Sequence, residues 1–217
     1  MQRLGQMVLA CLSFGAMMMS QIAYALELNA EVVSQTPQQL TLRYQTLNRS
    51  EDLVYLFVPV LHFVSGATAV KLATSGWLSL EGQHTARLTM GLVAPPAYIS
   101  VARRPPPVVT PVAAGKTHEG LIELPLPLLE SSPYFASQEC APPQLRSIVE
   151  MRVEIGWVEA RSNMAFQNVK IEDRDYQRLM GGWGAPTQRV STASVPVRGV
   201  ALCPNSAERF DRAQLQP

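Results

Sequence analysis

Side chains that could do chemistry are few in this sequence of 217 residues, and they are scattered along it. The three histidines are His62, His84 and His118, and none stands two or four positions from another, as a ready local metal site would place them. His62 lies in an apolar stretch that favours a packed histidine, and His118 precedes Glu119 in an expected loop. The spacing predicts no metal site, although distant histidines can still converge in a fold.

Carboxylates occur in pairs, but their spacing does not favour catalysis. Glu119 and Glu123, like Glu150 and Glu154, are four positions apart, which on a strand separates the Cα atoms by about 13 Å. Carboxyl pairs of glycosidases stand closer, so we expect solvated faces, with Arg152 between its two glutamates as an ion-pair partner. No nucleophile elbow, zinc-binding helix motif or phosphate-binding glycine loop is present. The sequence therefore predicts neither an enzyme nor a cofactor.

Two cysteines predict a disulfide. Of the three in the chain, Cys11 lies in the leader described below, which leaves Cys140 and Cys203. No Cys-x-x-Cys motif exists and no histidine is near either residue, so a metal pair or redox dithiol is the weaker alternative. A bond closing a loop of roughly 60 residues would contribute about 4 kcal/mol in the chain-entropy model. It would tie the end of the chain to its middle.

Aromatic and proline clusters indicate partner contact. Arg103 and Arg104 precede three prolines, and such a charged, stiff polyproline segment costs little entropy to bind. Tyr134 and Trp183 lie near expected loops, where exposed aromatics often anchor interfaces. The alternatives are core packing for the aromatic rings and a connecting role for the proline run. The candidate contact residues are Arg103, Arg104, Tyr134 and Trp183.

The first 25 residues have the three-part layout of a secretory signal peptide. Arg3 precedes an apolar run over 4–19, and small residues at Ala23 and Ala25 suit cleavage before Leu26. This apolar run is too short, and too interrupted by glycine and serine, to be a good transmembrane anchor. Cys11 follows a small residue, as in lipoprotein leaders, which keeps lipid anchoring as a minor alternative. We expect a periplasmic or secreted protein, with no membrane span after cleavage and an undetermined oligomeric state.

Charge argues against nucleic acid as a partner. The chain holds 18 basic and 17 acidic residues, and cleavage of the leader removes Arg3, which brings the formal net charge to zero. The only lysines are Lys71, Lys116 and Lys170, so no polybasic cluster exists.

Short alternating stretches separated by proline and glycine predict strands. Residues 146–158 are the best example, with odd positions from Val149 to Trp157 expected inside and Ile148 with its even neighbours outside. At Pro59 the stretch 53–64 is expected to break, to bulge or to run along a sheet edge. Residues 173–180 are expected to form one or two helical turns. The other expected strands are 28–32, 40–45, 69–73, 77–80, 85–92, 98–102, 120–124 and 190–202.

These stretches predict an all-β fold, an antiparallel β-sandwich with a barrel as the alternative. The strand, Asn-x-Ser turn and strand over 40–55 resembles part of bacterial immunoglobulin-like domains, although the Cys–Trp–Cys framework is lacking. We expect a sandwich core over 26–160, a C-terminal extension over 161–204 packed on the same domain, and a flexible tail over 205–217.

The leading functional hypothesis is an exported, non-catalytic module that works by protein–protein contact in the bacterial envelope. A secreted inhibitor or small-ligand carrier is the first alternative. A hydrolase whose residues converge from separate strands is the second.

Overall fold

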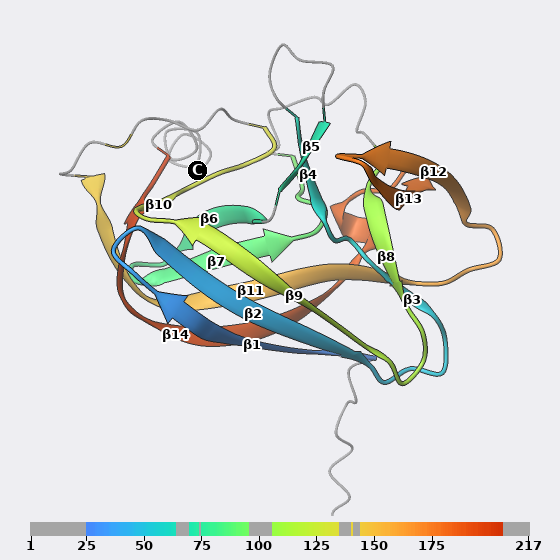
Figure 1. Cartoon of the computed structure of the whole chain (residues 1–217), viewed down its shortest axis with the longest axis horizontal. Helices are drawn as coiled ribbons and strands as arrows, with labels where there is room; N and C mark the ends of the chain where they lie inside the picture. Colours follow the sequence, from blue (N-terminus) through green and yellow to red (C-terminus); the bar gives the residue numbers. More distant parts are fainter. Residues whose placement is uncertain are drawn as a thin grey trace, which may run out of the picture.

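In the computed structural model of the chain (Figure 1), the described residues are 25–63, 70–73, 75–95, 106–134, 140 and 144–205, with 61–63 and 70–73 described by their backbone. Strands and turns make up most of this part of the chain, which also contains the 3₁₀ turn η2 (Ala185–Thr187). The all-β prediction is therefore confirmed. The leader lies outside the described residues, as does the strand expected at 98–102.

Three strands form a small antiparallel sheet. β2 (Gln39–Asn48) lies between β1 (Leu26–Gln35) and β9 (Thr117–Pro125). Over residues 40–45 of β2 the inward side chains alternate with outward polar ones, as the sequence predicts, since successive side chains of a strand point to opposite faces. The inward set is Leu40, Leu42, Tyr44, Thr46 and Asn48.

A larger sheet packs against the small one. At its centre β11 (Arg146–Glu159) pairs antiparallel with β14 (Arg189–Cys203) on one side and with β3 (Val54–Leu56) on the other. β7 (Thr85–Met90) runs parallel to β11 beside β3 and carries β6 (Trp77–Glu81). The remaining strands of this sheet are β8 (Val108–Val112), β13 (Arg174–Met180) and β12 (Ala165–Ile171) beyond β3, and β10 (Leu128–Leu129) beside β14.

One apolar core fills the space between the two sheets. It contains the inward leucines of β1 and β2, Ile122 and Leu124 of β9, and the inward residues of β7, β11 and β14. Two antiparallel-rich sheets over a shared core are consistent with a β-sandwich. A separate hairpin is formed by β4 (Val60–Phe63) and β5 (Val70–Ala73). The stretch 53–64 thus breaks before β4, next to Pro59.

The alternation predicted for β11 is correct over most of the strand but wrong at its start. Val149 is 54% exposed, whereas Ile148 is buried, the reverse of the prediction. The cause is a register shift between Ile148 and Glu150, where β14 contributes two more residues than β11 and Gly199 adopts a positive φ of 56°. Such a bulge turns the local side chains to the other face. The odd residues that are buried as predicted are Met151, Val153, Ile155 and Trp157.

The helical turns expected at 173–180 are wrong, because β13 occupies this stretch. It pairs with β12 through a two-residue turn at Glu172 and Asp173, both with positive φ, and with β8 on its other side. Leu179 enters a second apolar cluster with Phe57, which partly buried Trp183 also contacts. Long-range pairing therefore decides the conformation of a segment whose local pattern is weak.

Candidate functional site

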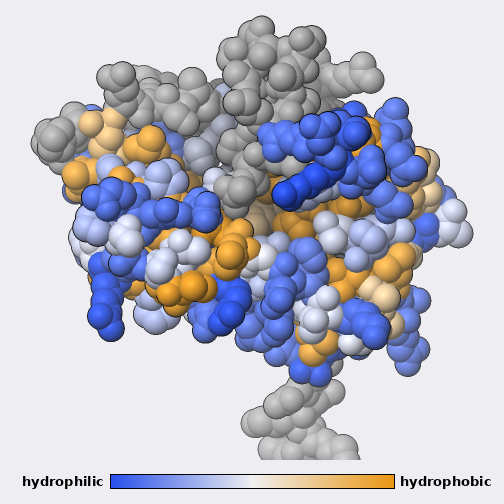
Figure 2. Space-filling model, in the orientation of Figure 1, coloured by the Kyte–Doolittle hydropathy of each residue, from blue (hydrophilic) through white to orange (hydrophobic). Residues whose placement is uncertain are grey.

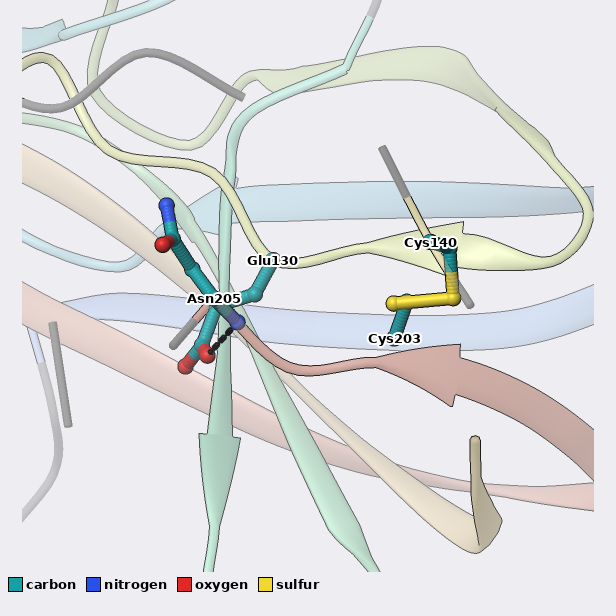
Figure 3. The surroundings of a disulfide bond; sticks show 4 residues. All are labelled: Glu130, Cys140, Cys203 and Asn205. Atoms are coloured by element: carbon teal, nitrogen blue, oxygen red, sulfur yellow. Dashed lines mark hydrogen bonds between the residues drawn. A yellow bond between two sulfur atoms is a disulfide. The ribbon is translucent and has the colours of Figure 1, made fainter. Parts of the chain in front are cut away.

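The two predicted cysteines form a disulfide at one end of the large sheet (Figure 3). Cys203 ends β14, and its Cα lies 5.8 Å from that of Cys140, across 63 positions of sequence. Cys203 is buried. The bond thus joins the last strand to the segment after β10, as the spacing predicts.

A buried carboxylate lies beside this disulfide and was not predicted from the sequence. Glu130 is only 4% exposed, and its two oxygens accept hydrogen bonds from backbone N–H groups. Oε1 accepts from Leu80 at 2.8 Å, and Oε2 accepts from Asn205 at 2.7 Å. The Glu130 N–H itself donates to the Cys203 carbonyl at 2.9 Å. Asn205 is buried rather than part of a frayed tail, because this carboxylate binds its backbone.

The segment that carries Glu130 also covers the outer edge of β6. Ser131 N–H donates to the Leu78 carbonyl at 2.7 Å, and Ser131 Oγ accepts from Leu78 N–H at 3.0 Å. Together with the bond from Leu80 to Glu130, these contacts use the groups through which another strand would pair with β6. We therefore assign Glu130 a structural role.

A tyrosine and a histidine meet inside the small sheet. Tyr44 Oη and His118 Nε2 share a hydrogen bond of 3.2 Å, and a Cβ on Gly120 would lie 2.7 Å from the tyrosine ring, so glycine gives that ring its space. Burial raises the pKa of Tyr44 to about 12. Burial lowers the pKa of His118, and the charge of Glu119 opposes this in part. Both rings are therefore kept neutral at neutral pH.

The prediction that His118 lies in a loop is wrong. It lies inside β9, because Thr117–Pro125 pairs with β2 along its length. His84 lies in the turn between β6 and β7, and its Nδ1 is 2.9 Å from the Ser147 carbonyl. Over the described residues, no group of three or more His, Cys, Asp or Glu side chains is placed to hold a metal. The side chain of His62 lies outside that part.

Two of the four predicted contact residues are described, and both are half-buried. Trp183 donates its Nε1–H to the Met180 carbonyl at 2.8 Å and packs on the second apolar cluster. Tyr134 donates its hydroxyl to the Val93 carbonyl at 2.7 Å. The two hydrogen bonds anchor different loops. Arg103 and Arg104 lie outside the described residues.

The carboxylates of β11 lie on its outer face, as expected, but Arg152 pairs differently. Its Nη1 is 2.8 Å from Glu81 Oε2, at the end of β6, rather than beside either glutamate of its own strand. Glu154 accepts a hydrogen bond of 3.2 Å from Thr89 of β7. Neighbouring strands, which sequence spacing does not reveal, supply both partners.

The outer face of the small sheet, meaning the outward side chains of β1, β2 and β9, is exposed and hollowed. A hollow of about 360 Å³ lies on it. Glu31 and Arg43, which form an ion pair, both line the hollow, and Leu121 of β9 is 57% exposed. Figure 2 shows this side of the molecule as a mixture of hydrophilic and hydrophobic residues. The hollow is lined by Asn29, Ala30, Glu31, Arg43, Gln45 and Glu119.

The edge of β9 borders this face. On one side β9 pairs with β2, and among the described strands none pairs with its other side. By contrast, β1 lies along β14, where Ser191 Oγ donates to the Leu26 carbonyl at 2.7 Å and the Gln35 side chain binds the Arg198 backbone. The shorter edge strand β12 lies close to β5. β9 is therefore the longest strand edge that the described residues leave uncovered.

No protein-family model, no curated protein and no solved structure matches the chain. Its described residues contain no helix that is long and apolar enough to cross a membrane.

Proposed function

We propose that the chain is an exported, non-catalytic β-sandwich module that acts through protein–protein contact in the bacterial envelope. The observation that carries the proposal is the uncovered edge of β9 together with the exposed Leu121 on the outer face of the small sheet. An exposed strand edge is costly for a protein, because its backbone groups invite pairing with other chains. A partner that pairs with the edge would explain why this nine-residue strand is left uncovered.

The strand order supports an immunoglobulin-like arrangement for this module. β1, β2 and β9 have the order of the A, B and E strands, and β3, β11 and β14 have that of the C, F and G strands. The chain crosses from β2 in the small sheet to β3 in the large one through the Asn48–Ser50 turn. Sandwiches of this kind are common in cell-surface recognition, although their architecture alone identifies no partner.

The disulfide and the leader support export. A disulfide persists in an oxidising compartment, which suits the periplasm or the exterior. Residues 1–25 supply the expected signal.

Photo-crosslinking in the producing cell tests the contact. A photoreactive phenylalanine derivative replaces Leu121, and a matched chain carries it at Val190 of β14, which is 42% exposed. The proposal expects a discrete crosslinked product from position 121 that is absent at position 190. The same products from both positions, or none from position 121, would contradict it.

A further inference from the structure

We propose that the uncovered edge of β9 binds an extended, basic segment of a partner protein, which adds to the small sheet as a further strand. This inference rests on the proposed function and specifies its partner. Strand addition is an established mode of peptide recognition, in which main-chain hydrogen bonds give affinity and alternate side chains give specificity.

The backbone of β9 provides the first part of the argument. In an antiparallel pair, one residue in two exchanges both of its hydrogen bonds with the neighbouring strand, and the residues between them point the other way. β9 pairs with β2 continuously from Thr117 to Pro125. About half of its N–H and C=O groups are therefore directed at the uncovered side, as far as Pro125, which has no N–H.

The charges beside that edge identify the partner. Glu119, Leu121 and Glu123 point outward from β9 and are exposed. The residues directly opposite the two glutamates in β2 are neutral, namely Gln45 and Thr41. Arg43 of β2 lies opposite Leu121 and is ion-paired with Glu31, and the charge of Glu119 also acts on it more weakly. An incoming strand with basic residues at alternate positions would therefore place cations beside both carboxylates, a favourable cross-strand arrangement.

A second copy of this chain fits the edge less well. An antiparallel pair of β9 strands with Leu121 opposite Leu121 sets Glu119 against Glu123 twice, and like charges directly opposite each other are unfavourable. A shift by one residue would turn the inward side chains outward. A shift that centres the pair on Glu119 brings that residue against its own copy. A register centred on Gly120 instead sets Glu119 against Leu121, so the acidic side chains disfavour self-pairing in the registers centred on Leu121 and Glu119 and favour a basic strand.

A synthetic peptide tests the proposal on the mature chain, residues 26–217. The probe is a capped nine-residue peptide with Lys-Thr-Val-Thr-Lys at its centre, and binding is followed by fluorescence anisotropy at low salt. One control peptide has glutamate in place of both lysines. Another has N-methyl groups on alternate backbone nitrogens, which removes the donors that strand addition needs. The proposal expects both controls to bind at least about tenfold more weakly.

Variants of the chain locate the site. E119K with E123K reverses the charge of the edge at exposed positions, and E172K with D175K makes the same change of charge on the distant β12–β13 hairpin. We expect the first pair to weaken peptide binding by about tenfold and to improve binding of the glutamate peptide, and the second pair to leave both within about twofold. Equal binding of the N-methylated peptide would overturn strand addition, as would an effect of the hairpin pair equal to that of the β9 pair.

The two proposals fail in different ways. Crosslinking from position 121 without peptide binding would overturn the basic-strand inference while keeping the contact function. Dimerisation of the chain, abolished by the β9 variant, would overturn the inference in favour of a second copy.

Discussion

Replacing Glu130 is expected to be among the most destabilising single changes in this protein. In E130A the backbone N–H groups of Leu80 and Asn205 lose the carboxylate oxygens that accept their hydrogen bonds at 2.8 and 2.7 Å. A hydrogen bond with a charged partner contributes about 1.5–3 kcal/mol, and each buried donor left alone carries a desolvation penalty. Two such bonds give an expected loss of about 3–6 kcal/mol in the free energy of unfolding.

Urea unfolding with the disulfide intact measures this loss. With an m value of about 2 kcal/mol per molar urea, the midpoint of unfolding should fall by roughly 1.5–3 M. E130Q keeps one acceptor but turns an amide donor toward the other N–H group, so its loss should be smaller than that of E130A. E123A, at an exposed position of β9, is the control and should change the stability by less than about 0.5 kcal/mol. A loss below about 1 kcal/mol in E130A would refute the assigned role of this carboxylate.

Three further predictions concern pH, a turn and the disulfide. Because burial lowers the pKa of His118 in the folded chain, the unfolded chain binds more protons just below the ordinary histidine pKa, so stability should fall as the pH drops through about 6.5. Urea midpoints at about pH 7.5 and 5.5 should show a smaller difference in H118Q, and an unchanged difference would contradict the argument. The pair E172N and D173G should raise the free energy of unfolding by about 1 kcal/mol, since both positions have positive φ and asparagine–glycine suits such a turn; a lower urea midpoint would be the contrary result. Reduction of the Cys140–Cys203 bond should lower stability by about 4 kcal/mol, measured by urea unfolding with and without reductant, and coinciding transitions would be inconsistent with this role.

Local alternation was sufficient to predict the strands that build the core. Over residues 40–44 of β2 and in most of β11 every second residue is apolar, and the two-residue period of a strand converts that pattern directly into one buried face. The disulfide was predictable for a different reason, since only two cysteines remain after the leader.

What the sequence did not predict depends on residues far apart in the chain. Ile148 and Val149 exchange faces because β14 bulges opposite them, more than 40 residues later. β13 is a strand because β8 and β12 flank it. Glu130 gave no signal, because the backbone N–H groups that it binds belong to Leu80 and Asn205. His118 was assigned to a loop, and only its pairing across from Thr46 makes it an inward residue of β9.

Glutamate side chains have opposite effects at two strand edges of this sandwich. At β6 the carboxylate of Glu130 turns inward and occupies a backbone N–H group, so that this edge offers less to another strand. At β9 the carboxylates of Glu119 and Glu123 turn outward, and among the described strands only β2 pairs with β9, on one side. A charge that only points outward does not block pairing altogether; it selects among partners by sign, because acidic strands are repelled and basic ones attracted. The charges of the β9 edge thus disfavour the self-pairing registers that bring its glutamates together, while the edge stays accessible to a strand of opposite charge.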